Sequence, residues 1–124
     1  RTDEEWKAVR RHALVLLGAP IFITMEGRKV ANAGEKSENP QVELQPEEIQ
    51  KLIDSDRPSF VRRARRLQDA AAMALKAIEI KDRDALFKSI ESIDHACENC
   101  HLHYWYPNDK RAHEAAKEEG MVVD

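Results

Sequence analysis

The strongest constraint on the fold is a pair of apolar seams in the second half of the chain. In the first seam, apolar residues recur at alternating steps of four and three, at Phe60, Ala64, Leu67, Ala71, Ala74 and Ile78. The second seam repeats this alternation at Leu86, Ile90, Ile93, Cys97, Cys100 and Tyr104. Because such a repeat keeps one face of an α-helix against its neighbours, the seams predict two long helices packed in a bundle.

The start of the chain predicts another long helix. Thr2 and Glu5 have the spacing of a capping box, and apolar residues follow at helical spacing from Trp6 to Leu16. Pro20 lacks a backbone N–H and clashes with the preceding turn, so we expect this helix to end or kink near Gly18-Ala19.

The remaining segments predict shorter elements. Residues 32–45 are expected to form a loop, and Pro46 opens a short helix that ends before Pro58. Pro107 ends the last long helix, and the charged tail at residues 108–124 contains a few helical turns closed by Gly120. We therefore expect an all-α fold, an antiparallel four-helix bundle with a short second helix, forming a single domain over residues 1–124.

Composition excludes several classes of protein. The 124 residues include only 4 glycines and 5 prolines, too few for the many tight turns of a β-sandwich or barrel. With 20 basic and 23 acidic side chains the formal charge is −3, which gives no reason to expect nucleic-acid binding. The longest apolar run, Ala13 to Ile23, is interrupted by Gly18 and Pro20, so we expect no membrane span.

The motif that carries chemistry is Cys97-Glu98-Asn99-Cys100-His101, which has the C-x-x-C-H pattern of c-type haem attachment. Each thiol can form a thioether with a haem vinyl group, and residues 97 and 100 share one face of a helix. His101 follows Cys97 by four residues, so its imidazole can bind the iron from the same side as the proximal ligand. We therefore expect one covalent haem c.

Residues of these types have three other uses in proteins. A redox dithiol favours a thioredoxin-like βαβ context, and no strand pattern occurs here. Zinc could draw on the crowded donors of this segment, although zinc sites usually combine two separated segments. The cysteines could also be plain structural residues beside a surface histidine. The donors for the zinc alternative would be His95, Cys97, Cys100, His101 and His103.

The neighbours of the motif are open to two interpretations each. Tyr104, Trp105 and Tyr106 could wall the edge of a haem or close the end of the helix. A basic cluster on the first seam's helix is interpreted as a solvated face, with docking of an acidic redox partner or contact with a haem propionate as the alternative. This cluster consists of Arg62, Arg63, Arg65 and Arg66.

The motif near the end of the last helix, the order of the elements and Tyr104 three residues after the haem histidine resemble the class II c-type cytochromes, the cytochrome c prime family and its low-spin relatives. Arg10, Leu14 and the pair Gly18-Ala19 look like that family's distal segment. The resemblance implies a haem inside a four-helix bundle, Leu14 over the open face of the iron, and a homodimer formed through the first helices.

The sixth iron ligand would decide the function. Leu14 there would leave the iron five-coordinate and open, whereas Met25 or His12 could bind it. In an antiparallel bundle the end of the last helix lies beside the early turns of the first, so Met25 would reach the iron only if Pro20 turned the chain back.

The leading expectation is an electron carrier without enzymatic activity that exchanges electrons with redox partner proteins. The alternative is a five-coordinate haem protein that binds nitric oxide or carbon monoxide. A peroxidase-like enzyme would need a distal acid–base pair, and only His12 could contribute to one. The charged start of the chain shows no leader. Because this haem is attached outside the cytoplasm, we expect a bacterial periplasmic protein whose signal peptide has been removed.

Overall fold

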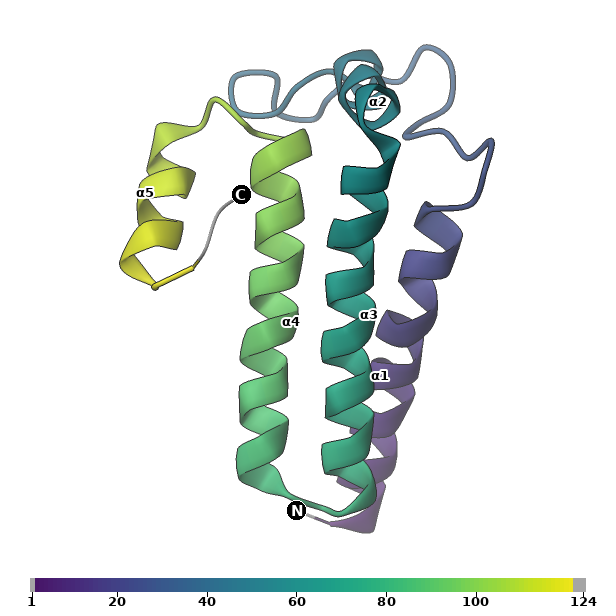
Figure 1. The fold of residues 1–124 in the computed structure, drawn as a ribbon, viewed down its shortest axis with the longest axis vertical. Coiled ribbons are helices and arrows are strands. Elements are labelled where there is room, and N and C mark those ends of the chain that lie inside the picture. The colour runs from purple at the N-terminus through teal and green to yellow at the C-terminus, as the bar shows by residue number, and fades with distance from the viewer. Residues whose placement is uncertain (1, 122–124) are drawn as a thin grey trace.

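The computed structural model describes residues 2–121, and all of the regular elements in this range are helices (Figure 1). The expected all-α fold is therefore confirmed for the described part of the chain. Residues 1 and 122–124, the latter at the end of the predicted tail, lie outside the description. The helices are α1 (Asp3–Ile23), α2 (Pro46–Ser55), α3 (Arg57–Glu79), α4 (Arg83–Tyr104) and α5 (Lys110–Glu118).

Three long helices form the body of the molecule. α3 packs against α1 on one side and against α4 on the other, whereas no Cα atoms of α1 and α4 come within 8 Å of each other. α1 and α4 run in the same direction and α3 runs opposite to both (Figure 1). At the lower end, Lys81 Nζ lies 3.1 Å from Asp3 Oδ1 and ties the start of α1 to the α3–α4 connection.

The short length of the second helix explains why α1 and α4 run in the same direction. α2 has 10 residues and α1 has 21, so at 1.5 Å per residue they span about 15 and about 32 Å. α2 is too short to return along α1, and it lies across the upper end instead (Figure 1). The short second helix is confirmed, but the antiparallel arrangement of four helices is not: α1 and α4 are parallel.

Four of the helices begin at a side-chain cap, and the cap at Thr2 was predicted. The side chains of Thr2, Asp56, Asp82 and Asp109 each accept a hydrogen bond from the backbone N–H three residues further along. Each bond satisfies an amide that has no partner within the helix. At the other end of the last helical segment, Gly120 has φ of +78°, which glycine adopts without strain, and it closes α5 as expected.

Pro20 does not end α1, and the helix continues to Ile23. Of the two outcomes expected near Gly18-Ala19, a helix end or a kink, the helix end is therefore wrong. Pro20 lies in the last turn of the helix and lacks an N–H, so the bond that this residue would donate to the preceding turn is absent. The carbonyl of Pro20 accepts bonds from the Thr24 amide at 3.2 Å and from Thr24 Oγ1 at 2.6 Å, which closes the helix end.

The core is divided along the bundle. A lower cluster is buried between α1, α3 and α4, and consists of Trp6, Ala13, Ala70, Ala74, Ala77, Ile78, Leu86 and Ile93. An upper cluster joins α2 to the ends of α3 and α4, and consists of Ile49, Ile53, Phe60 and Tyr104. A small third cluster holds α5 against α4, through Leu102, Ala116 and Met121. None of the described helices is both long and apolar enough to cross a membrane.

Candidate functional site

The C-x-x-C-H motif lies in the last turns of α4, close to the upper end of the bundle. Cys97 and Cys100 are free thiols, and both are half-buried. They are separated by about 4.5 Å along the helix axis at 1.5 Å per residue. Cys97 packs against the lower cluster and Cys100 against the upper cluster, as their places in the seam predict. The two thiols therefore face the core at the junction of its two parts.

Burial makes both thiols weaker acids than an exposed cysteine thiol. Burial raises the pKa of the Cys97 thiol, and the carboxylates of Asp94 and Glu98 raise it further. Burial raises the pKa of Cys100 to about 11, although the nearby Arg63 guanidinium acts in the opposite direction. Redox dithiols and thiolate nucleophiles depend on lowered pKa values. The raised values therefore count against a redox dithiol.

His101 presents its imidazole to solvent, unlike the cysteines. Its ring centroid lies 5.9 Å from that of Trp105 and 6.1 Å from that of Tyr106. Cys97, Glu98 and His101 also border a hollow of about 360 Å³ between α4 and α5. The imidazole is thus held among aromatic rings while its surroundings remain open enough for a ligand.

Tyr104 is the most buried of the three aromatic residues that follow the motif, at 1% exposure. Its ring meets Phe60 edge to face at 5.3 Å between centroids. Arg63 Nη1 lies 3.5 Å from the Tyr104 hydroxyl, and Arg63 Nη2 lies 3.4 Å from His103 Nδ1. Arg63 also donates to the hydroxyl of Ser59. Tyr104 therefore closes the upper cluster and helps to hold a guanidinium inside it.

The interpretation of the basic cluster as a solvated face is wrong for Arg63. It is 7% exposed, whereas Arg62, Arg65 and Arg66 are exposed. Arg63 follows Phe60 by three residues and precedes Leu67 by four, so it lies on the flank of the seam that faces α4. The sequence prediction assigned Arg63 to the solvated face because the residue is charged. Its spacing from Phe60 and Leu67, which places it on the buried side of the helix, was the signal that could have found it.

Trp105 and Tyr106 turn to opposite sides of the end of α4. Trp105 packs against the upper cluster, and Tyr106 packs against the third cluster beside α5. The Tyr106 hydroxyl lies 3.0 Å from both carboxylate oxygens of Glu98. Burial, together with this hydrogen bond, raises the pKa of Tyr106 far above its ordinary value. The two rings therefore cover different surfaces and do not form one continuous wall.

The three candidates for the distal side of the iron are all exposed. His12 and Leu14 lie in the middle of α1, and Leu14 is 41% exposed. Met25, at 52%, follows the end of α1. On α1, the partly buried residues packed against the same cluster as Cys97 are Val9 and Leu16. The structure thus brings Leu16, rather than Leu14, into the cluster that contains Cys97.

Because α1 and α4 run parallel, the motif does not lie beside the part of α1 that was expected. Ile23 at the end of α1 and Trp105 after the end of α4 line the same cavity. The end of α4 therefore lies beside the end of α1, not beside its early turns. Met25 consequently lies at the same end of the molecule as the motif without any reversal of the chain at Pro20.

The donors considered for zinc do not converge. Among residues 2–121, no three side chains of histidine, cysteine, aspartate or glutamate are grouped so as to hold a metal ion. His101 points to solvent and Cys100 into the upper cluster, while His103 lies against Tyr104 at 4.5 Å between ring centroids. A tetrahedral zinc site needs three or four donors around one point, so the zinc interpretation lacks its ligand set.

Comparison of the chain with models of protein families, with curated proteins and with solved structures found no match.

Proposed function

We propose that the chain is a monohaem c-type cytochrome that transfers electrons. Cys97 and Cys100 would bind the haem covalently, and His101 would be the proximal ligand of its iron. One observation carries the proposal: two free thiols face the apolar core from one helix, and an exposed imidazole follows them directly. This is the donor set that c-type attachment requires.

The chemistry of the two thiols fits this role. Addition of a thiol across a vinyl group forms a C–S bond and transfers the thiol hydrogen to carbon, so it needs no oxidant. Both sulfur atoms adjoin apolar clusters, which would exclude water from one side of a flat apolar group. A bound haem supplies an iron that gains and loses one electron.

The residues around the motif would set the affinity for that electron. The buried guanidinium of Arg63 lies beside the motif and lowers the cost of adding negative charge nearby. Tyr104 and His103 hold this guanidinium from the α4 side. Arg63 thus acts as a positioning and electrostatic residue.

The resemblance to class II c-type cytochromes extends the proposal. It implies attachment of the haem in a four-helix bundle, and here the short α2 would complete the bundle only at its upper end. Because this attachment takes place outside the cytoplasm, we propose a periplasmic location. The partners would be redox proteins and a second copy of the chain.

A second function, binding of nitric oxide or carbon monoxide at a five-coordinate iron, is favoured by a specific observation. The α1 residues in the cluster that Cys97 packs against are Trp6, Val9, Ala13 and Leu16, and none of these side chains binds iron. Met25 is the rival, because it lies at the same end of the molecule as the motif.

Covalent attachment can be tested directly. The chain is secreted to a bacterial periplasm together with haem-attachment machinery, and the denatured protein is examined by mass spectrometry and by its pyridine haemochrome spectrum. We expect one haem per chain, with one thioether lost in either Cys97→Ser or Cys100→Ser. His101→Ala should alter the spectrum of the native protein, whereas the matched control His113→Ala, on α5, should not. A wild-type chain without covalent haem would refute the proposal.

Carbon monoxide separates the two functions. An electron carrier with Met25 bound keeps a low-spin reduced spectrum that the gas does not change, and Met25→Ala converts it to high spin. His12→Ala is the matched test of the other candidate ligand. A wild-type reduced spectrum that shifts fully on addition of the gas would assign the open, gas-binding site instead.

A further inference from the structure

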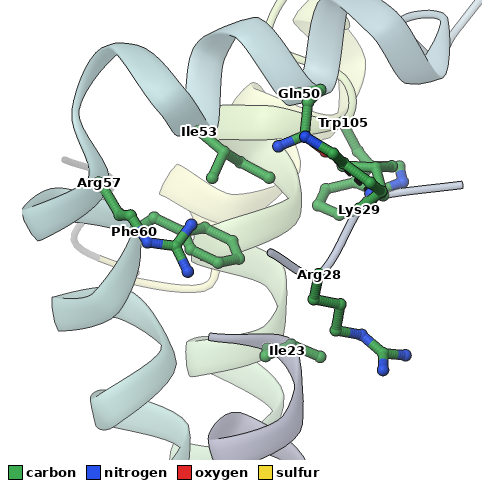
Figure 2. Close-up of a pocket in the computed structure, with 9 residues that line it drawn as sticks. Ile23, Arg28, Lys29, Gln50, Ile53, Arg57, Phe60 and Trp105 are labelled. Atoms are coloured by element: carbon green, nitrogen blue, oxygen red, sulfur yellow. Dashed lines mark hydrogen bonds between the residues drawn. The ribbon is translucent and has the colours of Figure 1, made fainter. Parts of the chain in front are cut away.

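A cavity of about 160 Å³ lies at the upper end of the bundle, above the motif (Figure 2). Its walls come from the end of α1, the following loop, α2, the start of α3 and the residue after α4. The lining residues are Ile23, Arg28, Lys29, Val30, Gln50, Ile53, Arg57, Phe60 and Trp105. In Figure 2, Phe60 and Arg57 face Trp105 and Lys29 across the cavity, and Arg28 extends outward at its rim.

The lining combines apolar walls with positive charge. Ile53 and Phe60 are buried in the upper cluster, and Trp105 packs against it. Arg28, Lys29 and Arg57 supply three cations, and no acidic residue is among the nine that line the cavity. Such a lining matches a ligand with an apolar body and carboxylate groups at one edge.

The cavity and the attachment site share one apolar cluster. Cys100 packs against the cluster that includes Ile53 and Phe60, and both of these residues also line the cavity. The ring of Trp105, which lines the cavity too, stands 5.9 Å from that of His101. A flat group attached at Cys100 and packed on this cluster would therefore extend toward the cavity.

The hollow on the other side of the motif has the opposite charge. It is bordered by the carboxylates of Asp94, Glu98 and Glu119, and these would repel an anionic edge. The positively charged cavity is the favourable side for carboxylates. Its volume of about 160 Å³ is below the roughly 300 Å³ of the smallest ordinary ligand pockets, so it suits one edge of a larger group.

We infer that the cavity holds the propionate edge of the haem, with Arg28, Lys29 and Arg57 as the cations that bind the two propionates. This inference rests on the proposed covalent haem. Arg57 is held in place because its Nη2 donates to the carbonyls of Thr24 at 2.8 Å and Met25 at 3.3 Å. Arg28 and Lys29 are exposed side chains of the loop and can close over the carboxylates.

The test uses the haem-loaded protein and the double variant Arg28→Gln/Lys29→Gln. Arg57 is left unchanged because it also binds backbone carbonyls. The control is Lys51→Gln/Arg62→Gln, which removes the same charge from exposed positions outside the cavity. The readouts are the amount of covalent haem and the reduction potential as a function of pH.

Loss of the two cations should favour the oxidised form and strengthen proton binding by the propionates. We expect the reduction equilibrium to shift about tenfold, about 59 mV for a one-electron couple, and the proton affinity of a propionate to rise about tenfold. The control variant should change either quantity less than twofold.

Two outcomes would overturn the inference. Equal potentials and pH profiles in the test and control variants would show that the cations do not bind the propionates. Binding of a fluorescent fatty acid to the haem-loaded protein, lost in Arg28→Gln/Lys29→Gln, would assign the cavity to a separate carboxylate ligand. A haem-free wild-type chain would refute the proposed function as well, and the amount of covalent haem distinguishes this failure from the other two.

Discussion

Replacement of Tyr104 by alanine tests how firmly the end of α4 is packed. The side chain is 1% exposed, and its ring contacts Phe60 edge to face. Removal of a buried aromatic ring costs about 3–5 kcal/mol through lost transfer free energy and the remaining cavity. Small domains have a total stability of about 5–15 kcal/mol, so Tyr104→Ala should remove a large part of it.

Two further variants divide this cost between ring and hydroxyl. Tyr104→Phe keeps the ring but removes the acceptor 3.5 Å from Arg63 Nη1, and should cost about 0.5–1.5 kcal/mol because the contact is long. A double-mutant cycle with Phe60→Ala should give a coupling of about 0.5–1.5 kcal/mol for the pair of rings.

The assay is urea unfolding followed by circular dichroism at a fixed haem content, with the dependence on urea compared between variants. Phe87→Ala is the matched control, since this ring on the same helix is 59% exposed and should cost less than about 0.5 kcal/mol. A cost below about 1 kcal/mol for Tyr104→Ala would refute the packing described for the upper cluster.

Four other predictions follow, two on the Cys100 thiol, one on the outer face of α1 and one on a helix cap. In folded haem-free protein the thiolate of Cys100 is disfavoured, so the rate of alkylation should rise with pH up to about 11, and a plateau near the ordinary thiol pKa would contradict this. The same raised pKa stabilises the fold below pH 9, and this contribution should decline as the pH approaches 11. Val15 and Phe22 are exposed on one face of α1, so Val15→Asp/Phe22→Asp should convert a homodimer to a monomer in light scattering; a monomeric wild type would contradict this. Asp82→Ala should lower stability by about 1 kcal/mol in thermal unfolding through loss of the α4 cap, and no change would show that the cap is dispensable.

The long helices could be predicted because their signals are local and agree with one another. Phe60 and Ile78 lie near the two ends of one seam, and both are buried. Asp56 and Asp82 cap α3 and α4 as their positions before the seams indicate. Periodicity and caps depend only on neighbours in the sequence, which is why they identified the elements.

The direction of the helices could not be obtained from the same signals. The apolar stripe of α1 fits either orientation against α3, and the antiparallel arrangement expected of a four-helix bundle was the wrong one, although the second helix was expected to be short. The length of α2 contains the missing information, because a helix of 10 residues cannot span the length of α1. Arg63 was missed for a related reason: its burial depends on the position of α4, which no local pattern records.

The parallel course of α1 and α4 also changes which part of α1 can face an attached haem. Trp105 and Ile23 line one cavity, and Cys100 precedes Trp105 by five residues, about 7.5 Å along the axis. The same distance down α1 from Ile23 leads to Gly18, one turn above Leu14. The residues of α1 level with the motif are therefore those from Val15 to Ala19, which include no histidine or methionine. A sixth protein ligand would therefore have to be His12, about one turn below Val15, or Met25, beyond the helix end. The choice between the two proposed functions thus depends on whether either of these side chains reaches the iron.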